Sequence, residues 1–569
     1  MDSFLDLFDP GTSPPTNCDV WPEDNDDDDD TRLPPEPQMG NVEYKLKLTS
    51  PSKLRFEHLV TQLKWRLREG HGEAIYEIGV EDTGRLTGLS SDDMKSSLIT
   101  LDQMAHKLGA TTSVLRERSV RKDKIVAEVL VRKVPDDQEC IEVMVAVLGG
   151  ADAGKSTLLG VLAHGEFDNG RGSARLNVLR HLHELRSGRT SSISHEILGF
   201  DAEGDVINYQ KARTAEEIRD RSSKLITFLD LAGHKKYLKT TVAGLSGYCP
   251  NHVMLVVSSP AVNVSSPTQL DMTKEHMDLA LALRLPFCIV VTKTDITPAD
   301  NTINWLESVL KSIGRRKVPL VIKSDDDVIT ASSAQPTQNV VPIFTISSVT
   351  GENLDLLTRF LYVLPPSLSI KEKERLEQEC CQFQIDEIFK VPEIGTIVGG
   401  VLTQGVVNIA SELVIGPLDN GTFVPVTVQS IHRNKAPCRV VKATQSASLS
   451  LEKVIPGLRN GMVLLGLGVN HSACIFFQAR IVVLYHATSI HNGFQTTVHI
   501  GNIRQTAAIV AIMECDKRGM HTNDSASVIF KFARHPEYVT EGMRLLFREG
   551  QTKGIGIVTQ VFDLQVVAG

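Results

Sequence analysis

The sequence predicts an α/β domain with a mostly parallel sheet and helices on both faces, followed by two antiparallel β-barrel domains. A small α+β domain and an acidic tail precede it. Apolar runs alternate with helical patterns over residues 136–366, which is typical of a parallel sheet covered on both faces. Beyond residue 380, short runs rich in Val, Ile and Thr with a period of two are typical of barrels. The length of 569 residues allows three or four units of roughly 150 residues.

The first 40 residues form the predicted acidic tail. They carry 12 acidic residues, including Asp26 to Asp30, against the single base Arg32, together with seven prolines. Such a segment has too few apolar groups to offset its ordering entropy. We therefore expect residues 1–40 to be disordered.

The composition excludes several classes of protein. Hydrophobic residues make up 41% and charged residues 23% of the chain, as in ordinary globular proteins. No apolar run reaches the roughly 20 residues of a membrane helix, and the N-terminus lacks the pattern of a signal peptide. Nine dispersed cysteines fit a reducing compartment. We expect a cytoplasmic protein without membrane contact, and a monomer.

Periodicity places the elements along the chain. In the α+β domain, residues 41–135, we expect strands at 42–48, 74–80 and 125–134 and helices at 56–69 and 98–108. In the α/β domain we expect strands at 141–148, 225–229, 252–257, 287–291 and 342–346, with helices at 273–283 and 301–312. The polar stretch 325–338 is predicted to be a surface loop. The barrels are expected at 380–468 and 470–569, divided near Asn470.

The strongest functional signal follows the first strand of the α/β domain. Its sequence GGADAGKS fits GxxxxGK[ST], and it lies between an apolar strand and a helical run. Backbone N–H groups of such a loop surround phosphate oxygens. Lys155 would neutralise the β- and γ-phosphates, and the Ser156 hydroxyl would bind Mg²⁺. The predicted phosphate-binding residues are Gly149, Gly150, Ala151, Asp152, Ala153, Gly154, Lys155, Ser156 and Thr157.

A second loop, DLAG, follows the strand at 225–229. Asp230 would hold Mg²⁺ through water, and the N–H of Gly233 would contact the γ-phosphate. Together with the glycine-rich loop, this motif predicts a domain that binds a nucleoside triphosphate with its magnesium.

Two more loops predict the base. Thr292, Lys293 and Asp295 of TKTD follow the strand at 287–291, and the aspartate would accept two hydrogen bonds from the N1–H and 2-amino groups of guanine. Adenine cannot supply this pair, so the site would discriminate strongly. After the last strand, a backbone N–H can reach the guanine O6 from the segment Ser347, Ser348 and Val349. Four loops at the carboxyl ends of the strands thus predict a site for GTP or GDP.

These motifs carry a specific resemblance. The histidine after DLAG and the downstream TKEH (273–276) resemble the translational GTPases of the elongation factor Tu class, as do residues 383–400 and 548–556. The segments EYKLKL, FEHLVTQLKWRL, IGVEDTG, GRTSS and SSVTGENLDLL resemble the GTP-binding protein 1 and 2 subfamily. The N-terminal block and SSISHEILGF favour the second of these members. The resemblance covers about residues 40–565.

The resemblance implies the activity and the partners. It implies a P-loop GTPase domain in which the hydroxyl of Thr190 binds Mg²⁺ and His234 positions the attacking water. It implies a factor that acts with the ribosome, binds aminoacyl-tRNA, and supports elongation or rescue of stalled ribosomes, with a rescue factor as a further partner. The alternative is a GTP-regulated adaptor whose barrels bind RNA-decay or other proteins. Basic residues that could contact RNA phosphates, or simply be solvated, are Lys235, Lys236, Lys239, Arg433, Arg439, Lys442, Arg504 and Arg548.

The chain departs from the elongation-factor pattern at four positions. Ala151 and Arg189 stand where those factors have valine and isoleucine, which form a hydrophobic gate around the catalytic histidine. Gly150 replaces a larger residue of the phosphate loop. Thr292 replaces the commoner asparagine and would remove an amide contact between loops. The resemblance therefore implies altered control of His234 and either weaker nucleotide affinity or faster nucleotide exchange, with guanine selectivity kept.

Overall fold

The computed structural model describes residues 32–564 except 71, 122, 135–139, 180, 188–189, 261–266, 314–316, 336–338, 367–369, 392–394, 434–435, 454, 470, 514–518 and 551. The predicted acidic run at 26–30 lies outside the described residues. The chain divides into two compact units. One comprises Pro22–Leu238 and Pro250–Glu372, and the other contains Lys239–Cys249 and Lys373–Gly569.

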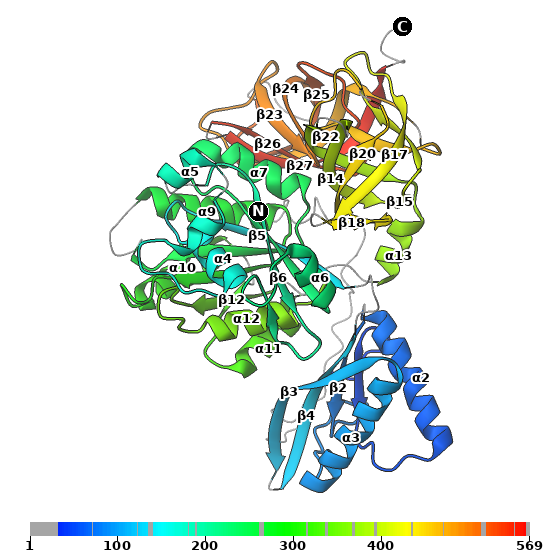
Figure 1. Cartoon of the computed structure of the whole chain (residues 1–569). Coiled ribbons are helices and arrows are strands. Elements are labelled where there is room, and N and C mark those ends of the chain that lie inside the picture. Colours follow the sequence, from blue (N-terminus) through cyan, green and yellow to red (C-terminus); the bar gives the residue numbers. More distant parts are fainter. Residues whose placement is uncertain are drawn as a thin grey trace, which may run out of the picture. The chain divides into compact units, whose positions relative to one another are not determined.

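The first unit begins with a four-stranded sheet in the order β1-β2-β4-β3, on which α2 and α3 pack side by side (Figure 1). β1 is parallel to β2, and the other pairs are antiparallel. Before β1, Leu33 N–H donates to the Gly84 carbonyl. The elements are β1 (Val42–Lys45), α2 (Lys53–Glu69), β2 (Glu73–Ile78), α3 (Ser91–Lys107), β3 (Ala110–Arg121) and β4 (Lys124–Lys133).

The α/β domain has an eight-stranded sheet in the order β11-β12-β10-β9-β5-β8-β6-β7. The six strands from β11 to β8 are parallel, and β6 and β7 form an antiparallel edge. Its strands are β5 (Ile141–Gly149), β6 (Ser194–Phe200), β7 (Val206–Ile207), β8 (Lys224–Asp230), β9 (His252–Ser258), β10 (Phe287–Thr292), β11 (Val318–Val321) and β12 (Val340–Thr345). Its helices are α4 (Lys155–His164), η2 (Ala174–Asn177), α5 (Leu182–Ser187), α6 (Ala215–Arg221), η3 (Lys235–Tyr237), α9 (Pro267–Ala282), α10 (Asp300–Ile313), α11 (Asp325–Ala334) and α12 (Leu354–Val363).

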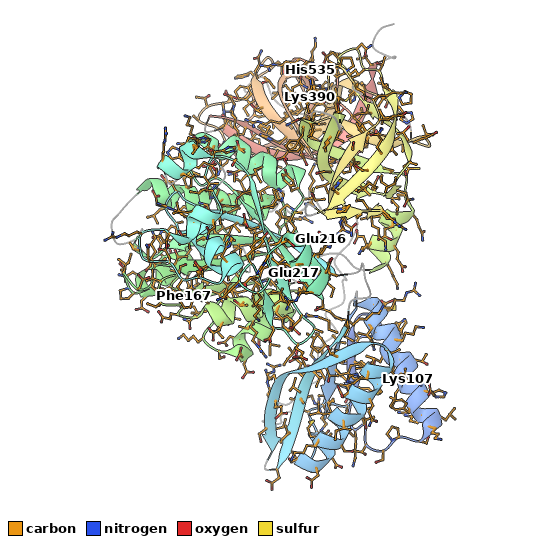
Figure 2. All side chains as sticks on the ribbon, in the orientation of Figure 1. Lys107, Phe167, Glu216, Glu217, Lys390 and His535 are labelled. Carbon is orange, nitrogen blue, oxygen red and sulfur yellow. The ribbon has the colours of Figure 1, made fainter. Side chains whose placement is uncertain are left out.

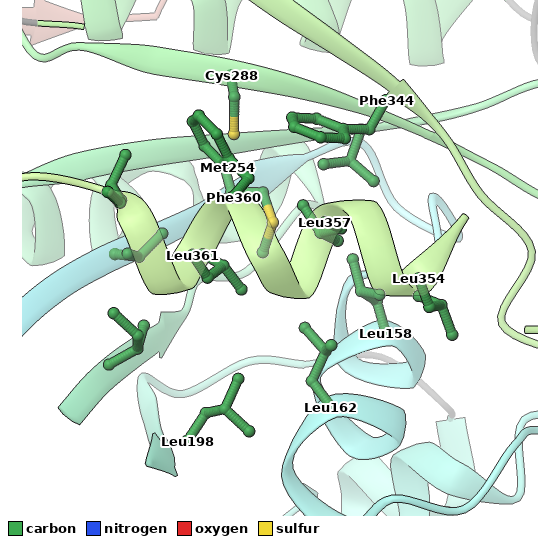
Figure 3. Packing of buried hydrophobic residues seen from close by; sticks show 14 of the residues in the cluster. Leu158, Leu162, Leu198, Met254, Cys288, Phe344, Leu354, Leu357, Phe360 and Leu361 are labelled. Carbon is green, nitrogen blue, oxygen red and sulfur yellow. The ribbon is translucent and has the colours of Figure 1, made fainter. Parts of the chain in front are cut away.

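The sheet is buried on both faces, as its continuous apolar strands predict. Leu158 and Leu162 of α4 and Leu357 of α12 pack with Met254 and Phe344 of the sheet (Figure 3). The alternate residues of the same strands are buried as well, and α9 contacts β5 and β9. None of the helices in the described part of the chain is long and apolar enough to cross a bilayer.

The prediction of a surface loop over 325–338 is wrong, because residues 325–334 form the helix α11. Ser324 caps its first turn, and the Asp327 side chain completes the capping box by accepting from the Ser324 N–H. The three aspartates that suggest a loop instead lie in the first turn, where the helix dipole favours negative charge. Val328 and Ile329 anchor the helix in the core. Strand β3 was also absent from the prediction.

The small sheet is joined to the α/β domain through a buried polar contact. The Arg132 guanidinium donates to Glu73 and to the Tyr362 carbonyl, and lies 4.0 Å from the centre of the Tyr362 ring. The Lys224 ammonium, also fully buried, donates to the carbonyls of Tyr362 and Leu364 at 2.6 and 2.5 Å. These five residues gather at the end of α12, so the small sheet is packed on the α/β domain through this helix.

The second unit contains α7 (Leu238–Gly247, from Lys239), α13 (Ile370–Gln378, from Lys373) and two antiparallel β-structures. In the first, the strands run β16-β21-β13-β14-β20-β17-β18, and the pairing of β16 with β17 closes a ring of six. In the second, β22-β25-β24-β23-β26-β27 form a closed barrel. The fold class is thereby confirmed, while the domain limits, including the division at Asn470, which lies outside the described residues, stay predictions.

The strands of the first β-structure and its short pair are β13 (Gln382–Val391), β14 (Gly395–Gln404), β15 (Val406–Asn408), β16 (Glu412–Gly416), β17 (Val424–Arg433), β18 (Ala436–Cys438), β19 (Val440–Lys442), β20 (Ser446–Leu451) and β21 (Val463–Gly466). Those of the closed barrel are β22 (Cys474–Tyr485), β23 (Gln495–Ile500), β24 (Ile503–Ile512), β25 (Ser525–Phe532), β26 (Arg544–Glu549) and β27 (Thr552–Asp563). Each has its own buried apolar core.

Candidate nucleotide-binding site

The four predicted loops lie at one edge of the eight-stranded sheet. They follow β5, β8, β10 and β12, which all run in the same direction. The central strand β5 lies between β8 and β9, so the chain order reverses there, and ligands of open α/β sheets bind at such a point. The structure therefore brings the four motifs to a common edge, as their position after the strands predicts.

A pocket lies over the glycine-rich loop at this edge. It is lined by Ala151, Asp152, Gly154, Lys155, Ser156, Thr157, Arg175, Thr190, Gly233 and His234. These residues include most of the predicted phosphate-binding set and the three predicted residues from the other segments, Thr190, Gly233 and His234.

The backbone of the glycine-rich loop approaches its neighbours closely. The buried Lys155 ammonium donates to the carbonyls of Gly149 and Gly150 at 3.1 and 2.9 Å. Burial lowers the pKa of this lysine, while Asp230 and Asp152 oppose that effect. A Cβ on Gly233 would lie 2.4 and 2.6 Å from the carbonyl oxygens of Gly149 and Gly150, so only glycine allows the second loop to lie on the first.

Three oxygen-bearing side chains meet beside the pocket. The Ser156 hydroxyl donates to Asp230 Oδ2 at 2.6 Å and lies 2.8 Å from the Thr190 hydroxyl, which is 3.3 Å from the same carboxylate oxygen. Asp230 is fully buried, and among the described residues its Oδ1 has no hydrogen-bond partner. Burial raises the pKa of Asp230, and Lys155 and the two hydroxyls oppose the increase. Hard oxygen ligands around an uncompensated buried carboxylate fit Mg²⁺.

The segment that carries Thr190 is held by a buried glutamate that sequence reasoning missed. Glu184 Oε1 accepts hydrogen bonds from the N–H and hydroxyl groups of both Ser191 and Ser192, at 2.7–3.0 Å. Burial alone would raise the pKa of this carboxyl, but these four hydrogen bonds lower it to about 2. Glu184 therefore stays ionised and fixes the backbone directly after Thr190. The neighbouring Gly188 and Arg189 lie outside the described residues.

The two loops that are predicted to recognise the base contact each other through Asp295. Its Oδ1 accepts a hydrogen bond from the buried Ser347 hydroxyl at 2.7 Å, while the Asp295 side chain itself is exposed at the edge of the sheet. The Ser347 hydroxyl oxygen in turn accepts from the N–H of Val349 at 3.2 Å. The predicted residues of the TKTD and SSV motifs are thus brought together, with a carboxylate facing solvent.

Thr292 makes a contact that its comparison with asparagine did not predict. Its hydroxyl donates to the Ala153 carbonyl at 2.7 Å, and Lys293 Nζ donates to the Asp152 carbonyl at 2.8 Å. The amide contact is absent at this position, and a hydroxyl donor joins the two loops in its place. The glycine-rich loop and the TKTD loop are joined at two points.

His234 lies at the rim of the phosphate pocket and begins a short helix. Its Nδ1 accepts a hydrogen bond from the Lys236 N–H at 3.2 Å, so the side chain caps η3. A neutral imidazole that accepts at Nδ1 carries its proton on Nε2. The ring therefore presents a donor nitrogen at its outer end.

Phe167 is a second residue that the motifs did not indicate. It is labelled in Figure 2 and is 60% exposed, which is unusual for a phenylalanine. A Cβ on Gly351 would lie 2.6 Å from the Phe167 ring, so the ring rests on the loop that carries Ser347. The next residue along, Asp168, donates its N–H to the Ser348 carbonyl at 2.9 Å. An apolar ring is thereby held beside the base-recognition loop.

Three of the candidate RNA-contacting residues gather inside the second unit. Lys239, Arg504 and Arg548 surround the buried His499, and burial together with these charges lowers the His499 pKa to about 3. Lys239 Nζ lies 3.4 Å from the Thr497 hydroxyl, and Arg548 is buried. Lys239 and Arg504 are exposed, so the alternative of solvated charge stays open for them. In the described residues no group of three or more His, Cys, Asp or Glu side chains could hold a metal ion.

Comparison with known proteins gives the family. Residues 142–367 match the family Elongation factor Tu GTP binding domain. GTP-binding protein 2 of Mus musculus is 54% identical over 538 residues, 93% of this chain and 88% of that protein. GTP-binding protein 1 of Xenopus laevis is 44% identical over 556 residues, 95% of this chain and 83% of that protein.

A solved structure gives the same fold. Translation elongation factor SelB from Methanococcus maripaludis, in its apo form, has a TM-score of 0.51 at 16% identity, over 75% of this chain and 81% of that chain. This likeness shows the fold alone. The family model and the identities to the relatives mean that the chain belongs to the GTP-binding protein 1 and 2 subfamily of the translational GTPases, which bind and hydrolyse GTP.

Proposed function

We propose that this GTPase acts with the ribosome, binds aminoacyl-tRNA in its GTP state, and supports elongation or the rescue of stalled ribosomes in the cytoplasm. The observation that carries the proposal is the position of His234. It lines the phosphate pocket and lies five residues before Lys239. From Lys239 onwards, α7 belongs to the same compact unit as the β-structures. Hydrolysis in the pocket can thus change the segment that leads into the proposed cargo-binding unit.

We assign the phosphates to the glycine-rich loop. The N–H groups of residues 149–157 would surround the β- and γ-phosphates, and Lys155 would turn from the two loop carbonyls to the phosphate oxygens. The N–H of Gly233 would contact the γ-phosphate, since only its missing side chain allows this close approach. Loss of the γ-phosphate would then release Gly233 and the adjoining His234.

Magnesium would be held by Ser156, Thr190 and Asp230, the three side chains that already meet beside the pocket. When bound, the ion supplies positive charge to the β- and γ-phosphate oxygens. The protein contributes the arrangement: Glu184 fixes Thr190 through Ser191, and burial keeps Asp230 from being solvated by water.

Guanine would be recognised by the Asp295 carboxylate, with Lys293 and Thr292 holding its loop on the phosphate loop. Of the three SSV residues, Ser347 donates its N–H to the Glu352 carbonyl and Val349 donates to the Ser347 hydroxyl. Their N–H groups are therefore already used within the loop. We assign the contact with the guanine O6 to the N–H of Ser348.

His234 would position the attacking water by donating from Nε2, the nitrogen that carries the proton in this conformation. Phosphoryl transfer depends on positioning and on charge neutralisation, so one well-placed donor can set the rate. A ring in this state cannot take a proton from water at Nε2. We therefore propose a role in orientation, with the proton passing to phosphate.

The histidine assignment is tested by GTP hydrolysis with and without ribosomes. We expect His234→Ala to keep its affinity for GTP within about threefold and to lose ribosome-stimulated turnover by at least about a hundredfold. His58→Ala, which changes an exposed histidine of α2, is the matched control. Unchanged turnover in His234→Ala would contradict the assignment, and Lys155→Ala should abolish GTP binding itself.

The tRNA assignment is tested by filter binding of charged tRNA in the presence of a non-hydrolysable GTP analogue or GDP. We expect retention with the analogue to exceed retention with GDP by about tenfold or more. Equal and weak retention with both nucleotides would contradict delivery of tRNA and favour the adaptor, in which the β-structures bind protein.

A further inference from the structure

Arg175 lines the phosphate pocket together with Lys155, Thr190, Gly233 and His234. No motif contains it: it lies between α4 and Thr190, in the short helix η2. Its guanidinium is a permanently charged group with five donors in a fixed planar arrangement that matches phosphate oxygens. An arginine in this position is therefore chemically suited to contact the nucleotide.

The backbone around Arg175 is held by a buried carboxylate. Asp168 accepts hydrogen bonds from the N–H groups of Gly170, Gly172 and Ala174, at 2.9, 3.0 and 3.1 Å, and from the Ser173 hydroxyl. Burial would raise the pKa of this carboxyl, but the four hydrogen bonds hold it below its usual value. The turn that delivers Arg175 to the pocket is thus fixed by an ionised group.

The helix η2 is also packed directly against the helix that begins in the phosphate loop. A Cβ on Gly160 of α4 would lie 2.1 Å from the Ala174 carbonyl oxygen, so the two backbones touch. Ala174 and Val178, on either side of Arg175, are buried in the core of the α/β domain. The backbone of Arg175 is therefore packed on the same helix, α4, that begins at Lys155. The other cations beside the pocket, Lys235 and Lys236, are exposed.

The geometry points to a catalytic role: we propose that the Arg175 guanidinium contacts the phosphates of bound GTP and stabilises the charge that develops during hydrolysis. As the water oxygen bonds to the γ-phosphorus, the bond from that phosphorus to the β,γ-bridging oxygen breaks, and its electron pair leaves with GDP. The protons of the water pass to phosphate and solvent. Arg175 takes no part in these transfers and acts by its charge, which is worth most where negative charge accumulates.

The test is single-turnover hydrolysis by the full chain without ribosomes or tRNA, so its failure is distinguishable from failure of the proposed function. We expect Arg175→Gln and Arg175→Ala to slow hydrolysis by about tenfold to a hundredfold, with GDP affinity within about threefold of the unchanged protein. Arg175→Lys should recover part of the rate, because it restores charge without the planar geometry. Arg171→Ala, which changes an exposed arginine of the same turn, should keep the full rate.

Binding of GDP with aluminium fluoride, which mimics the transferred phosphoryl group, gives a second readout. We expect Arg175→Gln to weaken this complex by about the same factor as hydrolysis, while binding of GDP alone is kept. Unchanged hydrolysis in Arg175→Gln would overturn the proposal. Equal losses of GDP binding and hydrolysis would overturn it as well, since they would assign Arg175 to ground-state binding or to folding.

Discussion

Glu184 Oε1 accepts hydrogen bonds from both the N–H and the hydroxyl of Ser191, at 2.7 and 2.8 Å, directly after Thr190. The backbone that presents Thr190, the threonine that we propose to bind magnesium, is therefore fixed by one buried carboxylate. The pKa of about 2 means that this carboxylate binds fewer protons in the folded chain than in the unfolded one. Its contribution to stability is complete above about pH 4.5 and is lost as the pH falls towards 2.

Replacing this carboxylate should loosen Thr190. In Glu184→Gln one oxygen acceptor remains but the charge is lost, so the four hydrogen bonds weaken. We expect the magnesium concentration at half-maximal GTP hydrolysis to rise by about tenfold, with GDP affinity little changed. Titration of hydrolysis with Mg²⁺ measures this. Glu166→Gln, at an exposed position, is the control, and an equal shift in both variants would contradict the role of Glu184.

Thr292 should contribute to nucleotide affinity through the Ala153 carbonyl. Thr292→Val keeps the shape but removes the donor, leaving that carbonyl without its buried partner, at a cost of about 1–3 kcal/mol. We expect the dissociation constants of GTP and GDP to rise by the same factor, about tenfold or more. Thr294→Val, whose hydroxyl has only an exposed contact of 3.4 Å with Glu352, should change neither constant. The prediction fails if the two variants behave alike.

The buried polar contact of Lys224 at the end of α12 predicts that the stability of the protein depends on pH. Burial, helped by Arg132 and opposed by Glu73, lowers the pKa of Lys224 to about 7. Between pH 7 and about 10.5 the unfolded chain therefore binds more protons at this group than the folded chain, and its contribution to stability rises with pH. Below pH 7 the full cost of the buried charge is present.

This dependence is tested by comparing the unchanged protein with Lys224→Met. We expect the free energy of unfolding of the unchanged protein to increase relative to that of Lys224→Met as the pH rises from 7.5 to 9.5. The increase should be up to about 1.4 kcal/mol per pH unit. Denaturant unfolding at several pH values measures it. Lys211→Met, which changes an exposed lysine, should show no such trend, and a flat difference for Lys224→Met would contradict the buried charge.

The sequence predicts the nucleotide loops well because each of them follows an apolar strand. Once β5, β8, β10 and β12 are placed, the parallel sheet brings their carboxyl ends to one edge. The motifs after these strands then predict which part of the nucleotide each loop binds. The small sheet and the barrels follow in the same way from their periodicity. The strands β3, β6, β7 and β11 and the helices α6, α11 and α12 were not predicted.

The residues that hold the site together could not be predicted in this way. Glu184, Asp168 and Phe167 lie between α4 and β6, where the chain has no clear period, and each acts through a contact made only in the folded protein. In the sequence, a glutamate that accepts hydrogen bonds from two serines cannot be distinguished from an exposed acidic residue. The same holds for an aspartate that accepts hydrogen bonds from the backbone of its own turn. The hydroxyl of Thr292 is similar, because its partner is a backbone carbonyl.

The most direct measurement of the central assignment is titration calorimetry of the full chain and of Asp295→Asn with GTP, ATP and xanthosine triphosphate. Asp295 presents a carboxylate that matches the two donors of guanine, and an amide would instead accept from one position and donate to the other, as xanthine requires. The account predicts that the unchanged protein binds GTP at least about a hundredfold more tightly than ATP, and that Asp295→Asn exchanges its preference for GTP for one for xanthosine triphosphate. Equal binding of GTP and ATP, or an unchanged preference in Asp295→Asn, would contradict it.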